Sequence, residues 1–236
     1  MKTVTLNSLR VAVTGGTSGL GLALIRALHV EGAAVAFVAR DSERVARVAA
    51  SLPGSHGIVG DVSRKDETHR IALQITAALG GLDVLVNNAS TLGPTPLALL
   101  ADTDCEDLEL ALATNLVGPF RLTKALLGAL AAAAREGKPA RVVNIVSDAA
   151  VTPYARWGVY GASKAGLLQL SRIWDEELRE HGVQVMAIDP GDMDTPMHAL
   201  AVPDADPASL KRPADAAREI IALMAAAPRQ LEGLGQ

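Results

Sequence analysis

The chain has 236 residues, of which 49% are hydrophobic and 3% aromatic, and its formal net charge at pH 7 is −4. This length fits one large domain, and the acidic balance provides no basic surface for a nucleic acid or an anionic membrane. The single cysteine, Cys105, excludes an internal disulfide and stands between two acids, which indicates an inert thiol in a reducing compartment.

We expect a cytoplasmic protein that does not enter a membrane. Residues 1–10 lack the apolar core of a signal peptide. The longest apolar run, residues 125–134, is too short to span a bilayer and contains Gly128.

The first predicted strand, residues 10–14, leads directly into a glycine-rich turn, residues 15–21, and then into an apolar stretch with helical spacing. This context allows a turn to hold phosphate at a helix N-terminus. Gly15 and Gly19 let the chain turn tightly, and Gly21 lets the helix approach the sheet. The spacing matches the common dinucleotide pattern only in part. A turn that is merely rich in small residues is the alternative, and the position after the first strand argues against it.

The second predicted strand, residues 33–39, ends at Arg40. In a dinucleotide fold this position meets the adenosine ribose, where an acid would bond the 2′-hydroxyl and repel a 2′-phosphate. A guanidinium instead binds phosphate well, so the sequence favours NADP over NAD. The alternative is that Arg40 is a solvated charge paired with Asp41 or Glu43.

The next predicted strands also end in polar residues. Residues 57–62 carry Asp61, whose carboxylate can accept a hydrogen bond from an adenine amino group or cap the helix predicted over residues 64–79. Residues 83–87 end in adjacent asparagines, the second of which is Asn88. Buried amides are costly unless bonded, so they are predicted to tie neighbouring strands together or to contact the cofactor.

A long helix is predicted over residues 104–135, with Pro119 inside it. Proline removes a backbone hydrogen bond, which predicts a kink near Asn115. The fifth strand, residues 141–147, ends at Ser147.

Tyr160 and Lys164 lie on a helix predicted over residues 158–181. Their i, i+4 spacing places the phenol and the ammonium on one face. A neighbouring cation favours the phenolate, so we expect the pKa of Tyr160 to fall from its ordinary value and the phenol to serve as a proton donor and acceptor. Such a pair also arises by chance about one time in twenty, as a surface pair of no consequence.

After a sixth strand, residues 183–188, the chain enters the segment Asp189-Pro-Gly-Asp-Met-Asp-Thr195. A loop over residues 198–213 precedes a last helix, residues 214–226. Long loops in compact domains often cover a binding site, so we expect a substrate loop over about residues 192–212.

Alternating strands and helices predict parallel βαβ units in a doubly wound sheet, with the ligand at the carboxyl ends of the strands. The polar and glycine-rich features all follow strands and therefore fall on one edge of this sheet. They are the Gly15 turn, Arg40, Asp61, Asn88, Ser147 and the Pro190 segment.

The motifs follow one another as Thr14-Gly15-x-x-x-Gly19-x-Gly21, Asp61-Val62, Asn87-Asn88-Ala89, Asn115, Ser147, Tyr160-x-x-x-Lys164 and Pro190-Gly191-x-x-x-Thr195. In this order they resemble the compact single-domain branch of the short-chain dehydrogenase/reductase family, over nearly the whole chain. The resemblance implies a single Rossmann-type α/β domain over residues 1–236, with helices on both faces of a parallel sheet of about seven strands. It also implies hydride transfer between a nicotinamide cofactor and a carbonyl or alcohol.

The resemblance implies catalytic roles as well. Tyr160 would act as the general acid/base, and Lys164 would hold the nicotinamide ribose and, with the oxidised nicotinamide, lower the pKa of the phenol. Ser147 would orient the substrate oxygen, and Asn115 would help anchor a water that relays protons through Lys164. The expected cofactor contacts are Gly15, Thr17, Ser18, Gly19, Leu20, Gly21, Arg40, Asp61, Val62, Asn88, Ala89, Tyr160, Lys164, Pro190, Gly191, Met193 and Thr195.

The chain departs from the family pattern at several places. Ser90 stands where glycine is frequent, which narrows the turn near the adenosine. Asp148 follows Ser147 where small or neutral residues are common, and its charge needs a partner if it is buried. Residues 225–236 lack the usual ending of the final strand, so the seventh strand is expected to be short or absent.

Apolar residues predict a partly apolar carbonyl substrate, and the expected contacts are Leu92, Tyr154, Trp157 and Met197. The two aromatics can equally pack a loop or a subunit contact. The histidines show no metal-ligand spacing, so no metal is expected. Excess apolar surface on the two long helices predicts a homodimer or homotetramer.

The competing functions are a non-catalytic dinucleotide sensor or scaffold, and a nucleotide-sugar epimerase or dehydratase. A sensor needs the glycine turn but no proton-transfer group, so the set of Asn115, Ser147, Tyr160 and Lys164 argues against it. The chain has no room for a substantial C-terminal substrate domain, which argues against the epimerase.

Overall fold

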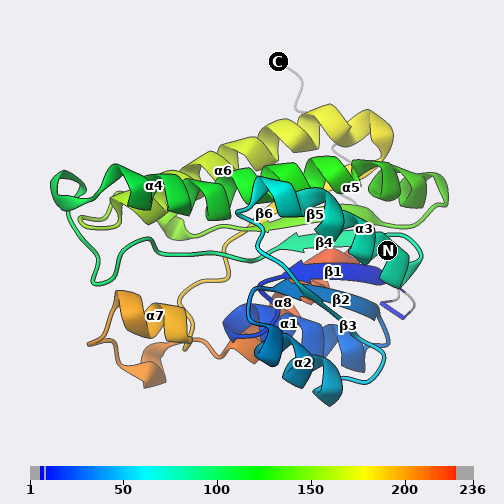
Figure 1. Cartoon of the computed structure of the whole chain (residues 1–236), viewed down its shortest axis with the longest axis horizontal. Helices are drawn as coiled ribbons and strands as arrows, with labels where there is room; N and C mark the ends of the chain where they lie inside the picture. The colour runs from blue at the N-terminus through cyan, green and yellow to red at the C-terminus, as the bar shows by residue number, and fades with distance from the viewer. Residues whose placement is uncertain (1–5, 8, 227–236) are drawn as a thin grey trace.

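The computed structural model describes residues 6–7 and 9–226 of the chain. In that part of the chain a parallel sheet runs in the order β3-β2-β1-β4-β5-β6 (Figure 1). Its strands are β1 (Arg10–Thr14), β2 (Ala34–Ala39), β3 (His56–Val59), β4 (Val84–Asn87), β5 (Ala140–Ile145) and β6 (Val183–Ile188). The reversal of strand order between β1 and β4 is the switch point at which doubly wound sheets bind ligands.

The central strands are short apolar runs because helices cover both faces of the sheet. Every residue of β4 and β5 is buried. In the register of the sheet, Val13 of β1 lies between Phe37 of β2 and Val86 of β4. The apolar side chains therefore stack in layers across neighbouring strands. This packing fixes the register of the strands and so the position at which each strand ends.

Two helix layers enclose the sheet, as Figure 1 shows. One layer contains α1 (Gly19–Val30), α2 (Ser42–Ser51) and α8 (Pro213–Ala225), whose apolar side chains share a core with Val11 and Val35. The other contains α3 (Thr68–Leu79), α5 (Gly118–Arg135) and α6 (Gly158–Leu178). The short α7 (Pro196–Ala201) lies beside the carboxyl ends of the strands.

The predicted long helix is a continuous helical segment, Cys105–Arg135. It consists of α4 (Cys105–Leu112), a π-helical turn (Ala113–Val117) and α5. The π turn stands where the sequence predicts a kink. By length and composition alone this segment is long and apolar enough to cross a membrane, whereas the apolar run over residues 125–134 is too short. Its buried leucines, however, pack on the sheet as those of a core helix.

Several predicted boundaries are wrong. Strand β3 ends at Val59, because Asp61 turns away and its backbone N–H donates to Glu67. Strand β5 ends at Ile145, two residues before Ser147. The loop predicted over residues 198–213 contains most of α7 and a 3₁₀ turn (Pro207–Ser209).

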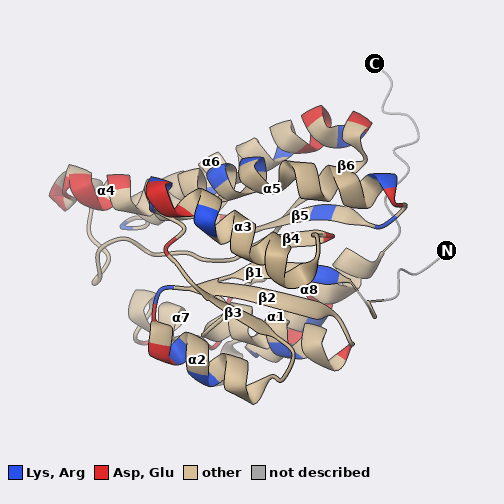
Figure 2. Ribbon diagram, turned by 45° about the vertical axis from the view of Figure 1, so that its right-hand side comes forward, with Lys and Arg blue, Asp and Glu red and all other residues tan. Residues whose placement is uncertain are grey.

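The other strands and helices confirm the predicted α/β class, and β6 has the predicted bounds. The seventh strand, expected to be short or absent, falls largely outside the described residues. In Figure 2 the Lys and Arg residues are scattered among acidic ones, and a group of acidic residues lies on α4.

Candidate active site

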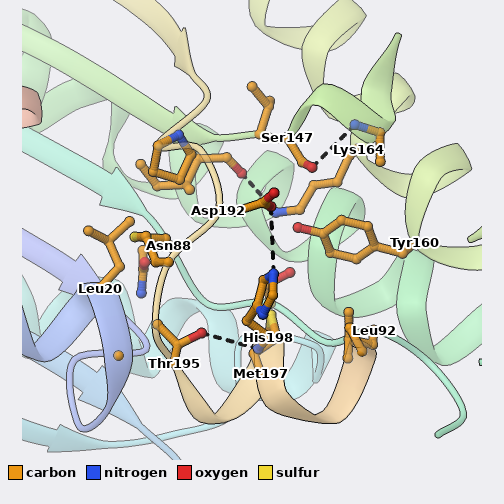
Figure 3. Close-up of a pocket in the computed structure, with 18 of the residues that line it drawn as sticks. Leu20, Asn88, Leu92, Ser147, Tyr160, Lys164, Asp192, Thr195, Met197 and His198 are labelled. Atoms are coloured by element: carbon orange, nitrogen blue, oxygen red, sulfur yellow. Dashed lines mark hydrogen bonds and ion pairs between the residues drawn. The ribbon is translucent and has the colours of Figure 1, made fainter. Parts of the chain in front are cut away.

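A cavity of about 600 Å³ opens at the carboxyl ends of the strands, between the glycine turn, the start of α6 and α7. Figure 3 shows Tyr160, Ser147 and Lys164 on one side of it, with Leu20 and Asn88 across from them. The predicted residues that line it are Gly15, Ser18, Gly19, Leu20, Gly21, Asn88, Ala89, Leu92, Ser147, Tyr154, Trp157, Tyr160, Lys164, Pro190, Gly191, Met193, Thr195 and Met197. The lining does not include Thr17, Arg40, Asp61, Val62 or Asn115.

The glycine turn leaves room for a ligand group at the start of α1. Gly15 and Gly19 have φ values of +71° and +48°, which side chains rarely adopt. A Cβ on Gly21 would lie 2.2 Å from the carbonyl oxygen of Gly15, so only glycine fits. The hydroxyl of Ser18 does not cap the first turn of α1 in the described structure. The backbone N–H groups of that turn are therefore available to bind a ligand. These features fit a phosphate of a dinucleotide.

Asn88 ties β4 to β1. Its side-chain amide donates to the Thr14 carbonyl over 2.8 Å, while the Thr14 hydroxyl accepts from the backbone N–H groups of Asn88 and Ala89, each at 3.0 Å. Of the alternatives that the sequence left open, the tie between strands is confirmed.

A buried amide, Asn144, lies behind the cavity and was not predicted from the sequence. Its side chain accepts from Asn87 and donates to the Ser171 hydroxyl, each over 2.8 Å. The available signal was an amide between the apolar residues Val143 and Ile145 of β5. This chain of bonds joins β4, β5 and α6 close to the site.

Tyr160 and Lys164 lie on successive turns of α6 and are 9% and 2% exposed. The Lys164 Nζ lies 5.5 Å from the centre of the phenol ring and donates to the Ile145 carbonyl over 2.8 Å. Burial lowers the pKa of Lys164 to about 8. Burial also raises the pKa of Tyr160 to about 12, although the Ser147 hydroxyl acts to lower it. The expected fall in the pKa of Tyr160 is therefore wrong for the protein without its cofactor, because desolvation outweighs the hydrogen bonds that favour the phenolate.

Ser147 follows β5 and faces the same cavity. Its hydroxyl donates to the Asp148 carboxylate over 2.9 Å and accepts from the Ala149 N–H over 3.2 Å. Asp148 is exposed, and its other oxygen accepts from the Tyr154 hydroxyl over 2.7 Å. The bond from Tyr154 is the main reason that the pKa of Asp148 lies below its usual value. The Asp148 carboxylate, which departs from the family pattern, thus has hydrogen-bond partners within the protein.

Aromatic rings form one wall of the cavity. Trp157 packs edge-on against Tyr160 with ring centres 5.8 Å apart, and against Tyr154 at 6.5 Å. Leu92 belongs to the same small apolar cluster, with Met197 of α7 packed on it. The four residues expected to contact substrate all line this cavity.

Asn115 is fully buried in the π turn and does not reach the cavity. Its side-chain oxygen accepts from the Thr91 N–H and the Ser90 hydroxyl, and its nitrogen donates to the Thr91 carbonyl and the Ser163 hydroxyl. These bonds use every donor and acceptor of the side chain, so it has none left for a water molecule. Ser90, the departure from glycine, supplies one of them.

The expected adenosine contacts lie at the same edge of the sheet, outside the cavity. Arg40 is exposed directly after the end of β2 and has no ion pair with Asp41 or Glu43 in the described residues. Instead, Asp41 caps α2 by accepting from the Arg44 N–H. The backbone N–H of Gly15 donates to the carbonyl of Val38, so the glycine turn adjoins the end of β2.

Asp61 closes a local turn in this structure: one of its oxygens accepts from the N–H and the hydroxyl of Ser63. The predicted capping of the following helix is wrong, because the 3₁₀ turn Lys65–Glu67 and α3 have Arg64 and Glu67 at their N-cap positions and no side-chain cap. Val62 and Thr17 are half-buried next to their turns.

Several polar residues of the cavity were not predicted from the sequence. Asp189, Asp192 and His198 line it, and the His198 Nε2 lies 3.9 Å from an Asp192 oxygen. His198 is carried into the cavity by α7, which the sequence did not predict. No group of three or more potential metal ligands occurs in the part of the chain that the structure describes.

The comparisons with known proteins agree with this geometry. Residues 10–206 match the family described as short chain dehydrogenase. Among curated relatives, the serine 3-dehydrogenase of Agrobacterium fabrum is 35% identical over 187 residues, which cover 78% of this chain and 72% of that protein.

Solved structures share the whole fold. A short chain dehydrogenase of Burkholderia cenocepacia in complex with NADP has a TM-score of 0.81 and 27% identity, covering 96% of this chain and 94% of its own. The 3-ketoacyl-(acyl-carrier-protein) reductase of Brucella melitensis complexed with NADH has a TM-score of 0.86 at 24% identity, covering 94% and 92%. At that identity the second similarity concerns the fold alone.

Proposed function

The chain belongs to the short-chain dehydrogenase/reductase family, and from this membership we propose that it is an NADP(H)-dependent oxidoreductase acting on a carbonyl or alcohol substrate. The observation that supports this most is the position of Ser147, Tyr160 and Lys164 in the same cavity as the glycine turn of α1. A positioned acid and a phosphate-binding turn in one cavity are what hydride transfer to a carbonyl requires.

In the proposed mechanism the glycine turn would hold the phosphates of the cofactor, and the Pro190 segment with Lys164 would hold its nicotinamide end. The chemistry that the cofactor would supply there is the donation or acceptance of a hydride. Tyr160 donates its proton to the carbonyl oxygen during reduction and removes the alcohol proton during oxidation. Its pKa, raised to about 12 by burial, keeps the phenol protonated at neutral pH, which suits the donor role.

Lys164 supports Tyr160 by position. Its ammonium is anchored on the Ile145 carbonyl near the phenol ring, so it directs positive charge toward the phenolate that forms when the proton leaves. A cationic nicotinamide would act in the same direction during oxidation. The negative charge that develops on the buried phenol is thus balanced by the nearby Lys164 ammonium, at a position where an unpaired charge would be costly.

Replacing Tyr160 tests the proposal. We expect Tyr160→Phe to lower kcat/KM for carbonyl reduction by at least roughly a hundredfold, because general acid catalysis contributes that much. NADPH oxidation over a panel of ketones and aldehydes measures the loss, while NADPH binding and thermal unfolding serve as controls. Cofactor binding without turnover of any compound, unchanged by the substitution, would contradict an enzyme and favour a dinucleotide sensor or scaffold.

We propose NADP as the preferred cofactor because Arg40 closes β2 beside the glycine turn and no acid occupies its position. Arg40→Ala should reduce the preference for NADPH over NADH by roughly tenfold or more, through the loss of a charge-assisted contact with the 2′-phosphate. Initial rates with both cofactors measure it. Arg47→Ala, an exposed arginine on α2, is the matched control, and an unchanged preference in Arg40→Ala would sink the assignment.

We also propose a homo-oligomer. The long helices expose large apolar side chains on their outer surfaces: Leu110 of α4 is 56% exposed, Phe120 of α5 37% and Ile173 of α6 45%. Phe120 additionally packs on Trp174 of α6 with ring centres 5.8 Å apart, so the two helices present one shared aromatic patch. Apolar surface of this kind favours association of identical chains.

A further inference from the structure

The Asp148 carboxylate is held at the rim of the cavity in a fixed orientation. One oxygen accepts from the Ser147 hydroxyl and the Ala149 N–H, over 2.9 and 2.8 Å, and the other accepts from the Tyr154 hydroxyl over 2.7 Å. A carboxylate has about four lone-pair positions, so one on the Tyr154 side stays open. Because Asp148 is exposed and lines the cavity, a bound molecule can reach that position.

The same bonds decide what Ser147 offers to a substrate. Its hydroxyl hydrogen points to Asp148, so the oxygen presents lone pairs, not a donor, to its surroundings. Next to the reacting position the protein therefore provides acceptors on the side of Ser147 and Asp148. The donor, the phenol of Tyr160, lies on the same side of the cavity as Ser147.

The charges around the cavity are mostly of one sign. Asp189 and Asp192 also line it, whereas Lys164 is fixed near the phenol on the Ile145 carbonyl. A further ionisable group, His198, lies close to Asp192. An anionic group on the substrate would meet repulsion here, while a hydroxyl or an ammonium would meet acceptors.

We propose that Asp148 determines substrate specificity, by selecting compounds that carry a hydroxyl or ammonium group on the carbon next to the reacting carbonyl or alcohol. A carboxylate at that position is disfavoured. This inference rests on the proposed function, because it assumes that the Tyr160 phenol holds the reacting oxygen. The substrate class is thus an α-hydroxy or α-amino ketone, or the corresponding diol or amino alcohol.

A set of matched ketones tests the inference. The compounds 2-hydroxyacetophenone, propiophenone and phenylglyoxylate share a phenyl ketone and differ in bearing CH₂OH, CH₂CH₃ or a carboxylate next to the carbonyl. The values of kcat/KM for NADPH-dependent reduction are compared between the wild type and Asp148→Asn, so that the intrinsic reactivity of each ketone cancels. Glu180→Gln removes one exposed charge in the 3₁₀ turn Arg179–His181 that follows α6, outside the cavity lining, and is the matched control.

In Asp148→Asn we expect the preference for the hydroxy ketone over the ethyl ketone to fall roughly tenfold, since a charge-assisted hydrogen bond is lost. The relative rate with phenylglyoxylate should rise by a similar factor. Glu180→Gln should leave both ratios unchanged, and NADPH affinity should be the same in all three proteins.

Unchanged ratios in Asp148→Asn, with active enzyme and normal NADPH affinity, would overturn the inference and leave the proposed function intact. Equal losses with all the ketones would likewise overturn it, because they would indicate a structural role. If the wild type binds NADPH but reduces no ketone or aldehyde in this set or the wider panel, the proposed function itself fails and the inference falls with it.

Discussion

Lys164 is the clearest case of a residue whose burial opposes its own charge. Its side chain is 2% exposed, and its ammonium donates to a backbone carbonyl, not to an acid. Tyr160 is affected in the opposite sense, since burial penalises its anion. The neutral phenol is thus stabilised and the ammonium is destabilised, which a spacing of i, i+4 in the sequence does not reveal.

This arrangement predicts a pH-dependent stability. Because the pKa of Lys164 is about 8 in the folded protein against an ordinary value of 10.5, the unfolded chain binds more protons between these values and stability rises with pH. Between pH 7 and 10 the gain should be roughly 2 kcal/mol in the wild type and absent in Lys164→Met. The raised pKa of Tyr160 has the opposite effect on stability, because the unfolded chain loses this proton first. The effect begins only at about pH 10 and is the same in both proteins.

Urea unfolding at several pH values measures the difference between the two proteins. A difference in unfolding free energy that stays constant from pH 7 to 10 would show that burial does not depress the pKa of Lys164.

Among the elements, the π turn in Cys105–Arg135 has the most specific task. It carries Asn115 to the segment around Thr91, where the side chain replaces backbone partners that this irregular stretch lacks. Asn115 thereby joins the long helix to α6 through Ser163 and fixes the connector that leads to Leu92.

Asn115→Ala should lower the free energy of unfolding by roughly 2–4 kcal/mol, because buried polar groups of Thr91 and Ser163 lose their partners. Thr114→Ala is the matched control in the same turn: it removes only a bond to the Leu110 carbonyl and should cost about 1 kcal/mol or less. Chemical denaturation compares the two. A stable Asn115→Ala protein with reduced kcat would instead support the proton-relay role that the family resemblance implies.

Elements could be predicted where one local pattern decides them. The apolar runs give β1, β2, β4, β5 and β6 within one or two residues, since a strand covered on both faces must be apolar throughout. The end of β3 depends on a bond from Asp61 to Glu67, and the hydrogen bonds of Asn115 depend on a distant connector. Contacts between segments that are far apart in sequence leave no such pattern.

The whole molecule brings the site together through its topology. Parallel strands place the glycine turn, Asn88, Ser147 and Pro190 on one edge, which could be deduced from strand order alone. The sequence did not reveal which of these residues are already bonded to the protein. The hydrogen bonds of Asp61 and Asn115 are made to other groups of the fold. Asp148 and Tyr154, which are six residues apart in the sequence, are bonded to each other at the rim of the cavity.

At this scale the proposed oligomer gives a further prediction. Ile173→Asp should shift the protein to smaller species, because a charge in an apolar interface must be desolvated. Sedimentation velocity measures the distribution. Val30→Asp, at an 82% exposed valine at the end of α1, is the control and should leave it unchanged. A wild type that is monomeric at micromolar concentration would refute the oligomer.

Transfer of label to a reduced ketone from NADPH deuterated at C4 of the nicotinamide tests the central claim most directly. The proposed mechanism predicts that one of the two C4 diastereomers places its deuterium on the new carbinol carbon, and that this transfer is lost in Tyr160→Phe. An alcohol formed without label from either diastereomer, or equal transfer by the Tyr160→Phe variant, would contradict the account.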